Sequence, residues 1–265
     1  MRTDLGLAGA VVLVTGGVRG VGLGISRVFR AHGATVVACA RHEPESLSPD
    51  TEFVACDVRD ENQVAAMVRG IADRHGRLDV VVNNAGGSPF APAAEASPRF
   101  HDKIVALNLL APLLVAQHAN AVMQTQDTGG AIVMISSVSG TRPSPGTAAY
   151  GAAKAGLDSL TTSLAVEWAP KVRVNALDVG MVRTEQAHLH YGSEAAVEAV
   201  GKTVPLGRLA DPEEIGSCAA FLASGLASYV SGATLRVHGG GEMPAFHTAT
   251  DVNSPTKSRR TSSDT

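Results

Sequence analysis

Residues 11–22 read Val-Val-Leu-Val-Thr-Gly-Gly-Val-Arg-Gly-Val-Gly, and a helical pattern follows them through Phe29 and stops at Gly33. The run of four apolar residues at 11–14 is typical of a strand that is buried on both faces. Glycines after such a strand let the backbone approach a ligand closely, and the start of the next helix attracts a diphosphate. The order of strand, glycine turn and helix therefore predicts a dinucleotide-binding unit.

The rest of the chain alternates short apolar runs with helical patterns. Further strands are expected at 35–40, 52–56, 78–82, 131–135, 172–177 and 233–237, and helices at 59–75, from Pro98 through Asn108, at 150–168 and from Asp211 to about Ala223. This alternation predicts an α/β fold: a doubly wound, Rossmann-type parallel sheet of about seven strands with helices on both faces. Because 42–50 is short and contains Pro and Ser, a loop is expected in place of the crossover helix there.

Composition narrows the class of protein. We expect one domain over residues 1–245, followed by a disordered polar tail at 246–265. The net charge is −3, from 22 basic and 25 acidic residues, which favours neither nucleic acid nor an anionic membrane as a partner. No signal peptide or apolar run of about 20 residues is recognised, so a soluble, cytoplasmic protein is expected. Three cysteines without a paired spacing indicate reduced thiols, and no metal-binding pattern is found.

The residue that ends the second strand indicates which dinucleotide is bound. An acid about 20 residues after the glycines binds the ribose hydroxyl of NAD, but this chain has Ala40 followed by Arg41. Arginine suits a 2′-phosphate through paired, charge-assisted hydrogen bonds, and Arg19 in the glycine turn offers a second positive charge. The pattern favours NADP(H) over NAD(H). The alternative is that both arginines are solvated loop residues, with Glu43 and Glu45 reducing the positive charge.

Tyr150 and Lys154 are four residues apart at the start of a long, Ala-rich helical pattern, so their side chains share one face. A free tyrosine titrates near ~10, and a neighbouring ammonium lowers that pKa because it favours the phenolate. The pair is a candidate proton-transfer device, although the same spacing occurs by chance on many helices. Asn108 lies among leucines in a helical pattern, and a buried amide needs hydrogen-bond partners, which invites a functional explanation.

Two polar stretches follow strands at the edge of the sheet where such folds bind ligands. Asp57 and Val58 end the third strand, where the acid accepts from an adenine amino group or caps the next helix. The stretch 83–86, Asn-Asn-Ala-Gly, follows the fourth strand. Beyond the sixth strand, 185–204 mixes apolar and polar residues, and we expect it to cover the site.

These stretches together resemble the short-chain dehydrogenase/reductase family over about residues 8–241. The resemblance rests on motifs in the family's order and spacing: Thr15-Gly-x-x-x-Gly20-x-Gly22, Asp57-Val58, Asn83-Asn-Ala-Gly86, Asn108, Ser137, Tyr150-x-x-x-Lys154 and Arg173-Val-Asn175. It implies an NAD(P)-dependent oxidoreductase that interconverts a secondary alcohol and a carbonyl.

The resemblance also implies a role for each matched residue. Tyr150 would exchange a proton with the substrate oxygen, and Ser137 would hydrogen-bond and polarise that oxygen. Lys154 would lower the pKa of the tyrosine and bind the nicotinamide ribose, and Asn108 would hold a water in a proton relay. The cofactor contacts that it implies come from Gly16, Arg19, Gly20, Val21, Gly22, Arg41, Asp57, Val58, Asn84, Ala85, Gly86, Tyr150, Lys154, Gly180 and, at the carboxamide, Thr184.

Three features depart from the family pattern. Where the family usually has Pro-Gly after the sixth strand, this chain has Asp178-Val179-Gly180. We expect Asp178 to face solvent, the alternative being a negative charge near the cofactor. His238 stands where the family often has Asp, and the crossover after the second strand is short. None of these departures falls on the four catalytic positions.

The interpretation favoured here is an NADP(H)-preferring oxidoreductase for a small-molecule substrate. The alternatives are an NAD-dependent secondary alcohol dehydrogenase and a catalytically silent dinucleotide-binding sensor or scaffold. The pattern does not distinguish a steroid, a sugar and an acyl chain as substrate. Family members commonly assemble through their long helices, so a homodimer or homotetramer is expected, with close approach permitted by Ala152, Ala153, Ala155 and Gly156.

Overall fold

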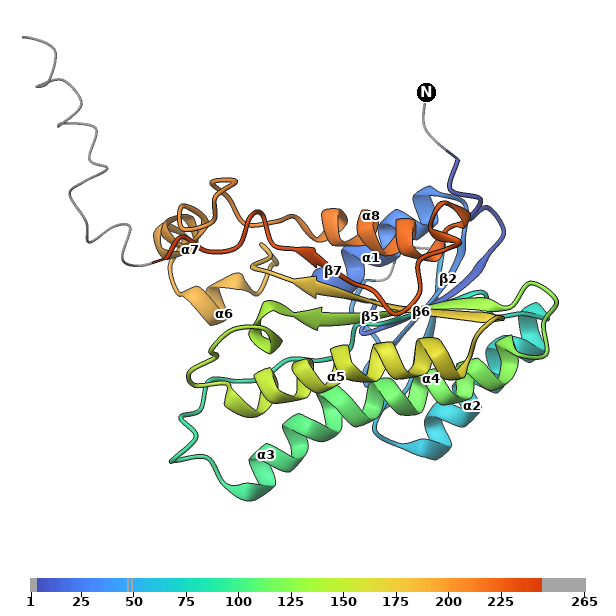
Figure 1. Ribbon diagram of the computed structural model, residues 1–265, viewed down its shortest axis with the longest axis horizontal. Coiled ribbons are helices and arrows are strands. Elements are labelled where there is room, and N and C mark those ends of the chain that lie inside the picture. The colour runs from blue at the N-terminus through green and yellow to red at the C-terminus, as the bar shows by residue number, and fades with distance from the viewer. Residues whose placement is uncertain (1–3, 47, 49, 245–265) are drawn as a thin grey trace, which may run out of the picture.

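A computed structural model describes residues 4–46, 48 and 50–244 of the chain (Figure 1). In these residues seven parallel strands form one sheet in the order β3-β2-β1-β4-β5-β6-β7. The strands are β1 Val11–Thr15, β2 Thr35–Ala40, β3 Thr51–Ala55, β4 Val80–Asn83, β5 Gly130–Ser137, β6 Val172–Val179 and β7 Thr234–Val237. The predicted doubly wound sheet is confirmed, and its order reverses between β1 and β4, where such folds form a crevice.

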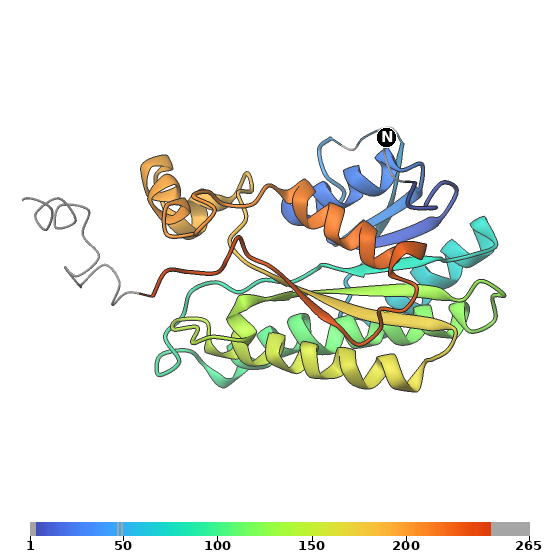
Figure 2. The same cartoon turned by 45° about the horizontal axis from the view of Figure 1, so that its top comes forward.

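Helices cover both faces of the sheet (Figures 1 and 2). They are α1 Gly20–Ala31, α2 Glu61–His75, α3 Pro98–Val105, α4 Ala111–Met123, α5 Ala148–Glu167, α6 Ala187–Tyr191, α7 Glu194–Gly201 and α8 Pro212–Ala223, with short helical segments η1 Ala106–Leu110, η2 Val138–Gly140 and η3 Gly225–Ala227. One apolar core lies between the sheet and α2, α4 and α5, and another lies between the sheet and α1 and α8. The helices α6 and α7 project beyond the carboxyl ends of the strands.

Glycines bring α1 and α8 into close contact. A Cβ atom added to Gly24 would lie 2.4 Å from the Cβ of Pro212, and one on Gly216 would lie 3.0 Å from the carbonyl oxygen of Gly24. Neither position has room for a larger side chain without a shift of the neighbouring helix.

The expected helix around Asn108 is longer and less regular than the pattern predicts. It runs from Pro98 to Met123, and residues 106–110 form one π-helical segment, η1. By length and composition this 26-residue helix could cross a membrane, with a mean hydropathy of 1.4 over its most apolar window. It packs against α2, α5, β4 and β5, and the buried core helix of a folded domain has the same composition.

The helix caps predicted from the sequence are confirmed in two cases and wrong in one. Ser97 caps α3 as expected, accepting from the backbone of Phe100 at 3.2 Å, and Asp211 begins α8 with a capping box. Of the two roles left open for Asp57, that of capping the next helix is wrong, because α2 is capped by Asp60. The loop expected after β2 is confirmed for residues 41–46, 48 and 50. The tail predicted at 246–265 lies outside the described residues.

Candidate active site

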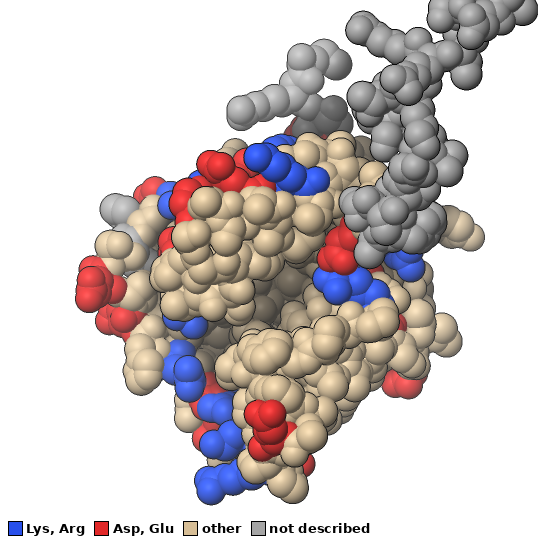
Figure 3. Space-filling model, turned by 90° about the vertical axis from the view of Figure 1, so that its left-hand side faces the viewer, with Lys and Arg blue, Asp and Glu red and all other residues tan. Residues whose placement is uncertain are grey.

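The carboxyl ends of the parallel strands open onto a hollow in the surface. The strands end on the left of Figure 1, and the view onto that side shows the hollow with mostly uncharged walls and several Lys and Arg side chains around it (Figure 3). Parallel α/β sheets bind ligands at this edge, and the residues predicted for the site lie on the segments that follow these strands.

Three glycines of the turn after β1 cannot take a side chain without strain or a steric clash. Gly16 and Gly20 have φ values of +64° and +51°, a region that favours glycine. A Cβ on Gly22 would lie 2.1 Å from the carbonyl oxygen of Gly16. This cradle lets a ligand approach the backbone, as a dinucleotide requires.

Thr15 joins this turn to the loop after β4. Its hydroxyl oxygen accepts hydrogen bonds from the backbone N–H groups of Asn84 and Ala85, both at 2.9 Å, and the Asn84 side chain donates to the Thr15 carbonyl oxygen at 2.9 Å. Two of the predicted cofactor-binding segments are therefore held as one unit.

The start of α1 binds an anion from within the chain. The Glu185 carboxylate accepts from the backbone N–H of Gly20 at 2.9 Å, and α1 has no acidic residue in its own first turn. Thr184 lies against the same turn, because its methyl carbon would be 3.5 Å from a Cβ on Gly20. A carboxylate at this position shows that the donor set fits negative charge, which is the property needed for a diphosphate.

The charged residues predicted to bind the adenosine part of a cofactor differ in their partners. Both oxygens of Asp57 are held by the Arg59 guanidinium, at 2.9 and 2.6 Å, and these hydrogen bonds lower the pKa of Asp57 below its usual value. Arg41 also lowers that pKa through its charge, so it lies within electrostatic range. Arg41 and Arg19 are exposed, and no hydrogen bond or ion pair engages Arg41 within the described part of the chain.

Three further residues that are predicted to contact the cofactor also pack against other parts of the fold. Val58 is a buried core residue, and Val21 packs against the core under α1 and α8. Gly180 lies against the segment that follows β7, since a Cβ there would be 2.8 Å from the Cα of His238.

Tyr150 lies in the first turn of α5, where its phenol meets the end of β5. The Lys154 ammonium is 5.6 Å from the centre of the Tyr150 ring. Burial raises the pKa of Tyr150, whereas hydrogen bonding to Ser137 lowers it and the charge of Asp178 raises it further. The structure thus brings Ser137, Tyr150 and Lys154 together. The expectation of a lowered phenol pKa is wrong in this structure, because burial outweighs the hydrogen bond.

Lys154 is directed to the backbone rather than to the phenol. Its side chain is 3% exposed, and its ammonium donates to the Ile135 carbonyl oxygen at 2.7 Å. Burial lowers the pKa of Lys154 to about 8, while the nearby charge of Asp158 opposes the fall.

Asn108 is buried, and backbone groups satisfy its amide. The side-chain oxygen accepts from Gly87 N–H at 2.8 Å, and the side-chain nitrogen donates to the carbonyl oxygens of Gly87 and Ile104 at 3.0 and 2.9 Å. Asn108 therefore anchors the loop after β4 to the π-helical segment. Single π-helical turns are frequent at functional sites. Asn108 and Lys154 both lie near Gly86, because a Cβ there would be 2.7 Å from the Asn108 oxygen and 3.5 Å from the Lys154 nitrogen.

Asp178 does not face solvent. It is the last residue but one of β6 and is fully buried, so the expectation of an exposed carboxylate is wrong. It lies beside Ser136 in the sheet register. Burial raises its pKa, and the Thr141 hydroxyl opposes this.

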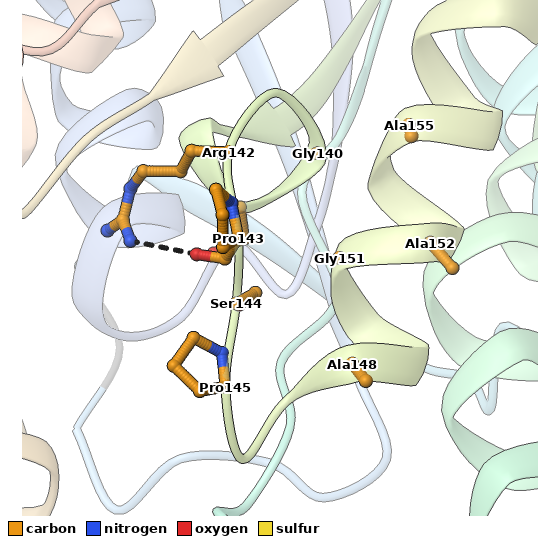
Figure 4. A pocket seen from close by; sticks show the side chains of 10 residues that line it. Gly140, Arg142, Pro143, Ser144, Pro145, Ala148, Gly151, Ala152 and Ala155 are labelled. Atoms are coloured by element: carbon orange, nitrogen blue, oxygen red, sulfur yellow. Dashed lines mark hydrogen bonds between the residues drawn. The ribbon is translucent and has the colours of Figure 1, made fainter. Parts of the chain in front are cut away.

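A pocket of about 530 Å³ lies beside the loop that joins β5 to α5 (Figure 4). Ser139, Gly140 and residues 142–145 form one side of it, and Ala148, Gly151, Ala152 and Ala155 of α5 form the other. The Arg142 side chain extends away from α5, where it pairs with Glu242 at 2.6 Å. Ser137 and Tyr150 do not line this pocket, so it lies outside the cluster of Ser137, Tyr150 and Lys154.

Three residues of the site were missed by the sequence interpretation. The sequence motifs include Thr15 without giving it a role, Arg59 is predicted only as the start of a helix, and Glu185 is predicted only as part of the covering segment 185–204. An acid directly after the predicted carboxamide contact, Thr184, was a usable signal for Glu185. The described residues contain no cluster of three His, Cys, Asp or Glu side chains that could hold a metal ion.

Known proteins are similar to this chain along most of its length. A family model described as enoyl-(acyl carrier protein) reductase matches residues 16–242. An uncharacterized short-chain type dehydrogenase/reductase of Sinorhizobium fredii is 37% identical over 88% of this chain, although the match spans only 43% of that protein. The D-threitol dehydrogenase of Mycolicibacterium smegmatis is 36% identical, covering 89% of this chain and 94% of that one. The solved aldohexose dehydrogenase of Thermoplasma acidophilum has a TM-score of 0.85 and 31% identity, covering 90% of this chain and 96% of that one.

Proposed function

Since the chain belongs to the short-chain dehydrogenase/reductase family, whose members are NAD(P)-dependent oxidoreductases of alcohols and carbonyls, we propose that it transfers a hydride between NADP(H) and a secondary alcohol or its carbonyl, with Tyr150 as acid/base. The observation that carries the proposal is the cluster of Ser137, Tyr150 and Lys154 at the end of β5.

Each residue of the cluster has a defined task. Ser137 hydrogen-bonds the substrate oxygen and holds it beside the phenol. Tyr150 gives a proton to that oxygen during reduction and takes it during oxidation. Lys154 places positive charge beside the phenol ring and binds the cofactor ribose, and Asn108 keeps the loop after β4 in place and holds a water of the proton relay. The nicotinamide, when bound, supplies or takes up the hydride.

Cofactor contacts follow from the glycine turn and the loop after β4. The backbone of Gly16, Gly20 and Gly22 holds the diphosphate together with the start of α1. Asp57, Asn84, Ala85 and Gly86 line the path towards the catalytic cluster, with Val21, Val58, Gly180 and Thr184 as its walls.

The preference for NADP(H) rests on Arg41. Its guanidinium is exposed at the end of β2, and Arg59 already neutralises the nearby Asp57. A 2′-phosphate therefore meets positive rather than negative charge here. Arg19 adds a second cation.

The test is turnover by the purified protein with NADP+ and NAD+ across a panel of alcohols. The panel includes threitol, an aldohexose and a hydroxysteroid, because relatives bear the names D-threitol dehydrogenase, aldohexose dehydrogenase and 3alpha-hydroxysteroid dehydrogenase. Tyr150→Phe is expected to bind cofactor normally and to lose most turnover, on the order of 10²-fold or more. Tyr229→Phe is the matched control, since Tyr229 is fully exposed.

Other outcomes point to the alternative functions. Near-normal turnover by Tyr150→Phe contradicts the proposed acid/base. Tighter binding of NAD+ than of NADP+ supports an NAD-dependent secondary alcohol dehydrogenase. Cofactor binding without turnover on any alcohol or ketone supports a sensor or scaffold.

The proposal extends to assembly and location. A homodimer or homotetramer would pair α5 with its copy, since Ala152 and Ala155 are exposed on that helix, and Val166 and Leu110 are 80% and 54% exposed. Ala153 is buried within the chain and does not contribute. The three cysteines are unpaired in the described residues, which suits the reducing cytoplasm.

A further inference from the structure

The start of α1 takes its negatively charged partner from a distant part of the chain. The N-cap residue, Arg19, forms no capping hydrogen bond through its side chain, and the first turn of α1 contains no acidic residue. Instead the Glu185 carboxylate, 165 positions along the chain, accepts from the backbone N–H of Gly20 at 2.9 Å. The first N–H groups of a helix have no partner within the helix and attract negative charge. Glu185 therefore supplies the anion that α1 itself lacks.

The N–H group of Gly20 belongs to the glycine turn that would hold the cofactor diphosphate. A carboxylate and a diphosphate repel each other at hydrogen-bond distance, so both cannot accept from this group together. The Glu185 side chain is exposed, and within the described residues the bond to Gly20 is the only hydrogen bond or ion pair of its carboxylate. Glu185 can therefore exchange Gly20 for water when another anion takes its place.

Glu185 also begins the covering segment 185–204, which contains α6 and α7. The two helices pack mainly against each other and stand beyond the carboxyl ends of the strands (Figures 1 and 2). Their small apolar core consists of Ala187, Val197 and, just after the segment, Leu209. The chain before the segment is held at α8, where the backbone N–H of Arg183 donates to the Ala210 carbonyl oxygen at 2.8 Å. The bond from Gly20 to Glu185 thus ties the first residue of the segment to the glycine turn.

We propose that Glu185 is an internal competitor of the cofactor diphosphate: its carboxylate ties the covering segment to the start of α1, and a dinucleotide displaces it on binding. The place of the diphosphate rests on the proposed function, whereas the bond between Glu185 and Gly20 does not. Displacing the carboxylate costs part of the binding free energy of the cofactor. It also releases the first residue of the covering segment, so cofactor binding is coupled to the position of α6 and α7.

Calorimetric titration of three ligands tests the competition. Glu185→Gln removes the charge with little change of shape, and the Kd values of NADP+ and ADP-ribose are expected to fall by about tenfold, because a charged acceptor no longer has to leave the helix start. Inorganic pyrophosphate, which carries only the diphosphate, should gain affinity by a similar factor. Glu198→Gln makes the same charge change at an exposed position of α7 and should leave all three Kd values unchanged.

Hydrogen–deuterium exchange of the backbone amides in 186–204 provides the second readout. Saturating pyrophosphate should raise this exchange in the unmodified chain, because a segment that loses a tie opens more often. In Glu185→Ala the exchange should be raised already, and pyrophosphate should add nothing. Glu198→Gln should respond to pyrophosphate as the unmodified chain does.

The contrary outcomes are distinct. Unchanged or weaker binding of ADP-ribose and pyrophosphate by folded Glu185→Gln overturns the proposal, and with a lowered thermal stability it would make Glu185 only a helix cap. Weaker binding of NADP+ alone also overturns it, since Glu185 would then act at the nicotinamide. Tighter pyrophosphate binding by a variant whose parent turns over no alcohol or ketone supports the role of Glu185 while contradicting the proposed function. A chain that binds neither ADP-ribose nor pyrophosphate contradicts both.

Discussion

Three polar side chains of the site form hydrogen bonds with backbone atoms of another segment, namely those of Lys154, Asn108 and Thr15. Lys154 donates to β5, Asn108 bonds to the loop after β4, and Thr15 accepts from that loop. Such bonds fix the side chains before any ligand binds, which is the property that electrostatic catalysis requires. The residue types were predictable from the motifs, whereas these partners were not, because they belong to segments distant in sequence.

The exposure of Asp178 was likewise not predictable from the sequence alone. The sequence places Asp178 just after a strand expected at 172–177, whereas β6 runs to Val179. The exposure of Asp178 depends on α5 and on the loop holding Thr141, which cover that face of the sheet. A strand pattern alone does not tell which end of the sheet is covered, so the expectation of a solvent-facing carboxylate failed.

Arg41 provides a test of cofactor preference at the residue scale. Arg41→Asp places a carboxylate where a 2′-phosphate would lie, so the ratio of NADP+ to NAD+ affinity is expected to fall by at least about tenfold through charge repulsion. Isothermal titration of both cofactors measures it. Arg69→Asp, an exposed arginine of α2, is the control, and an unchanged ratio in Arg41→Asp would show that Arg41 is a bystander.

Lys154 makes stability depend on pH. Its pKa is about 8 in the folded chain, against an ordinary value of 10.5. Between these values the unfolded chain binds more protons, so the free energy of unfolding rises with pH, by on the order of 3 kcal/mol across the window. Lys154→Met should remove this rise in urea unfolding measured from pH 8 to 10.5, whereas Lys202→Met, at an exposed position, should retain it. A rise that persists in Lys154→Met would contradict the assignment.

At the scale of elements, the sequence was most informative where a strand is buried on both faces. The bounds of β2 agree with the prediction, and the caps at Ser97 and Asp211 were readable from side-chain chemistry. The π-helical segment was not readable, because its extra residue per turn is stabilised by bonds from Asn108 to the distant Gly87 as well as to Ile104. The same bonds explain why a polar amide lies among leucines.

Alanine substitutions of two helical glycines should have opposite effects on stability, because Gly24 lies at the contact between α1 and α8 and Gly70 does not. Gly24→Ala would force a Cβ within 2.4 Å of Pro212 and is expected to destabilise the fold by about 1–3 kcal/mol. Gly70→Ala in α2 meets nothing within 4 Å and should stabilise it by about 0.5–1 kcal/mol, because alanine favours a helix. Chemical denaturation of both variants gives the comparison. Equal effects would show that helix propensity, not packing, dominates at Gly24.

At the scale of the whole molecule, the alternation of strands and helices was sufficient to predict the architecture. Parallel sheets bury both faces, and right-handed crossovers leave few ways to connect the strands. An oligomeric assembly is harder to predict from the sequence, since it depends on which side chains remain on the surface after folding. Of the four small residues expected to pair copies of α5, Ala153 is used inside the chain.

An exposed position of α5 tests the proposed assembly. Ala155→Arg would place a long cation in the proposed contact between copies. The mass of the assembly in analytical ultracentrifugation is expected to fall to half or to that of a single chain. Ala66→Arg on the exposed side of α2 should leave the mass unchanged. An Ala155→Arg protein of unaltered mass and normal thermal unfolding would locate the contact elsewhere.

The π-helical turn at 106–110 also constrains how this chain can vary in length. A π-helical turn holds one residue more than an α-helical turn, so the segment accommodates an extra residue while α3 and α4 keep their faces aligned. Deleting one residue from 106–110 would therefore restore an ordinary helix with Ile104 still directed to the core, but the bulge that carries Asn108 towards Gly87 would be lost. Inserting a further residue would instead rotate α3 by about 100° relative to α4 and take Ile104 out of the core.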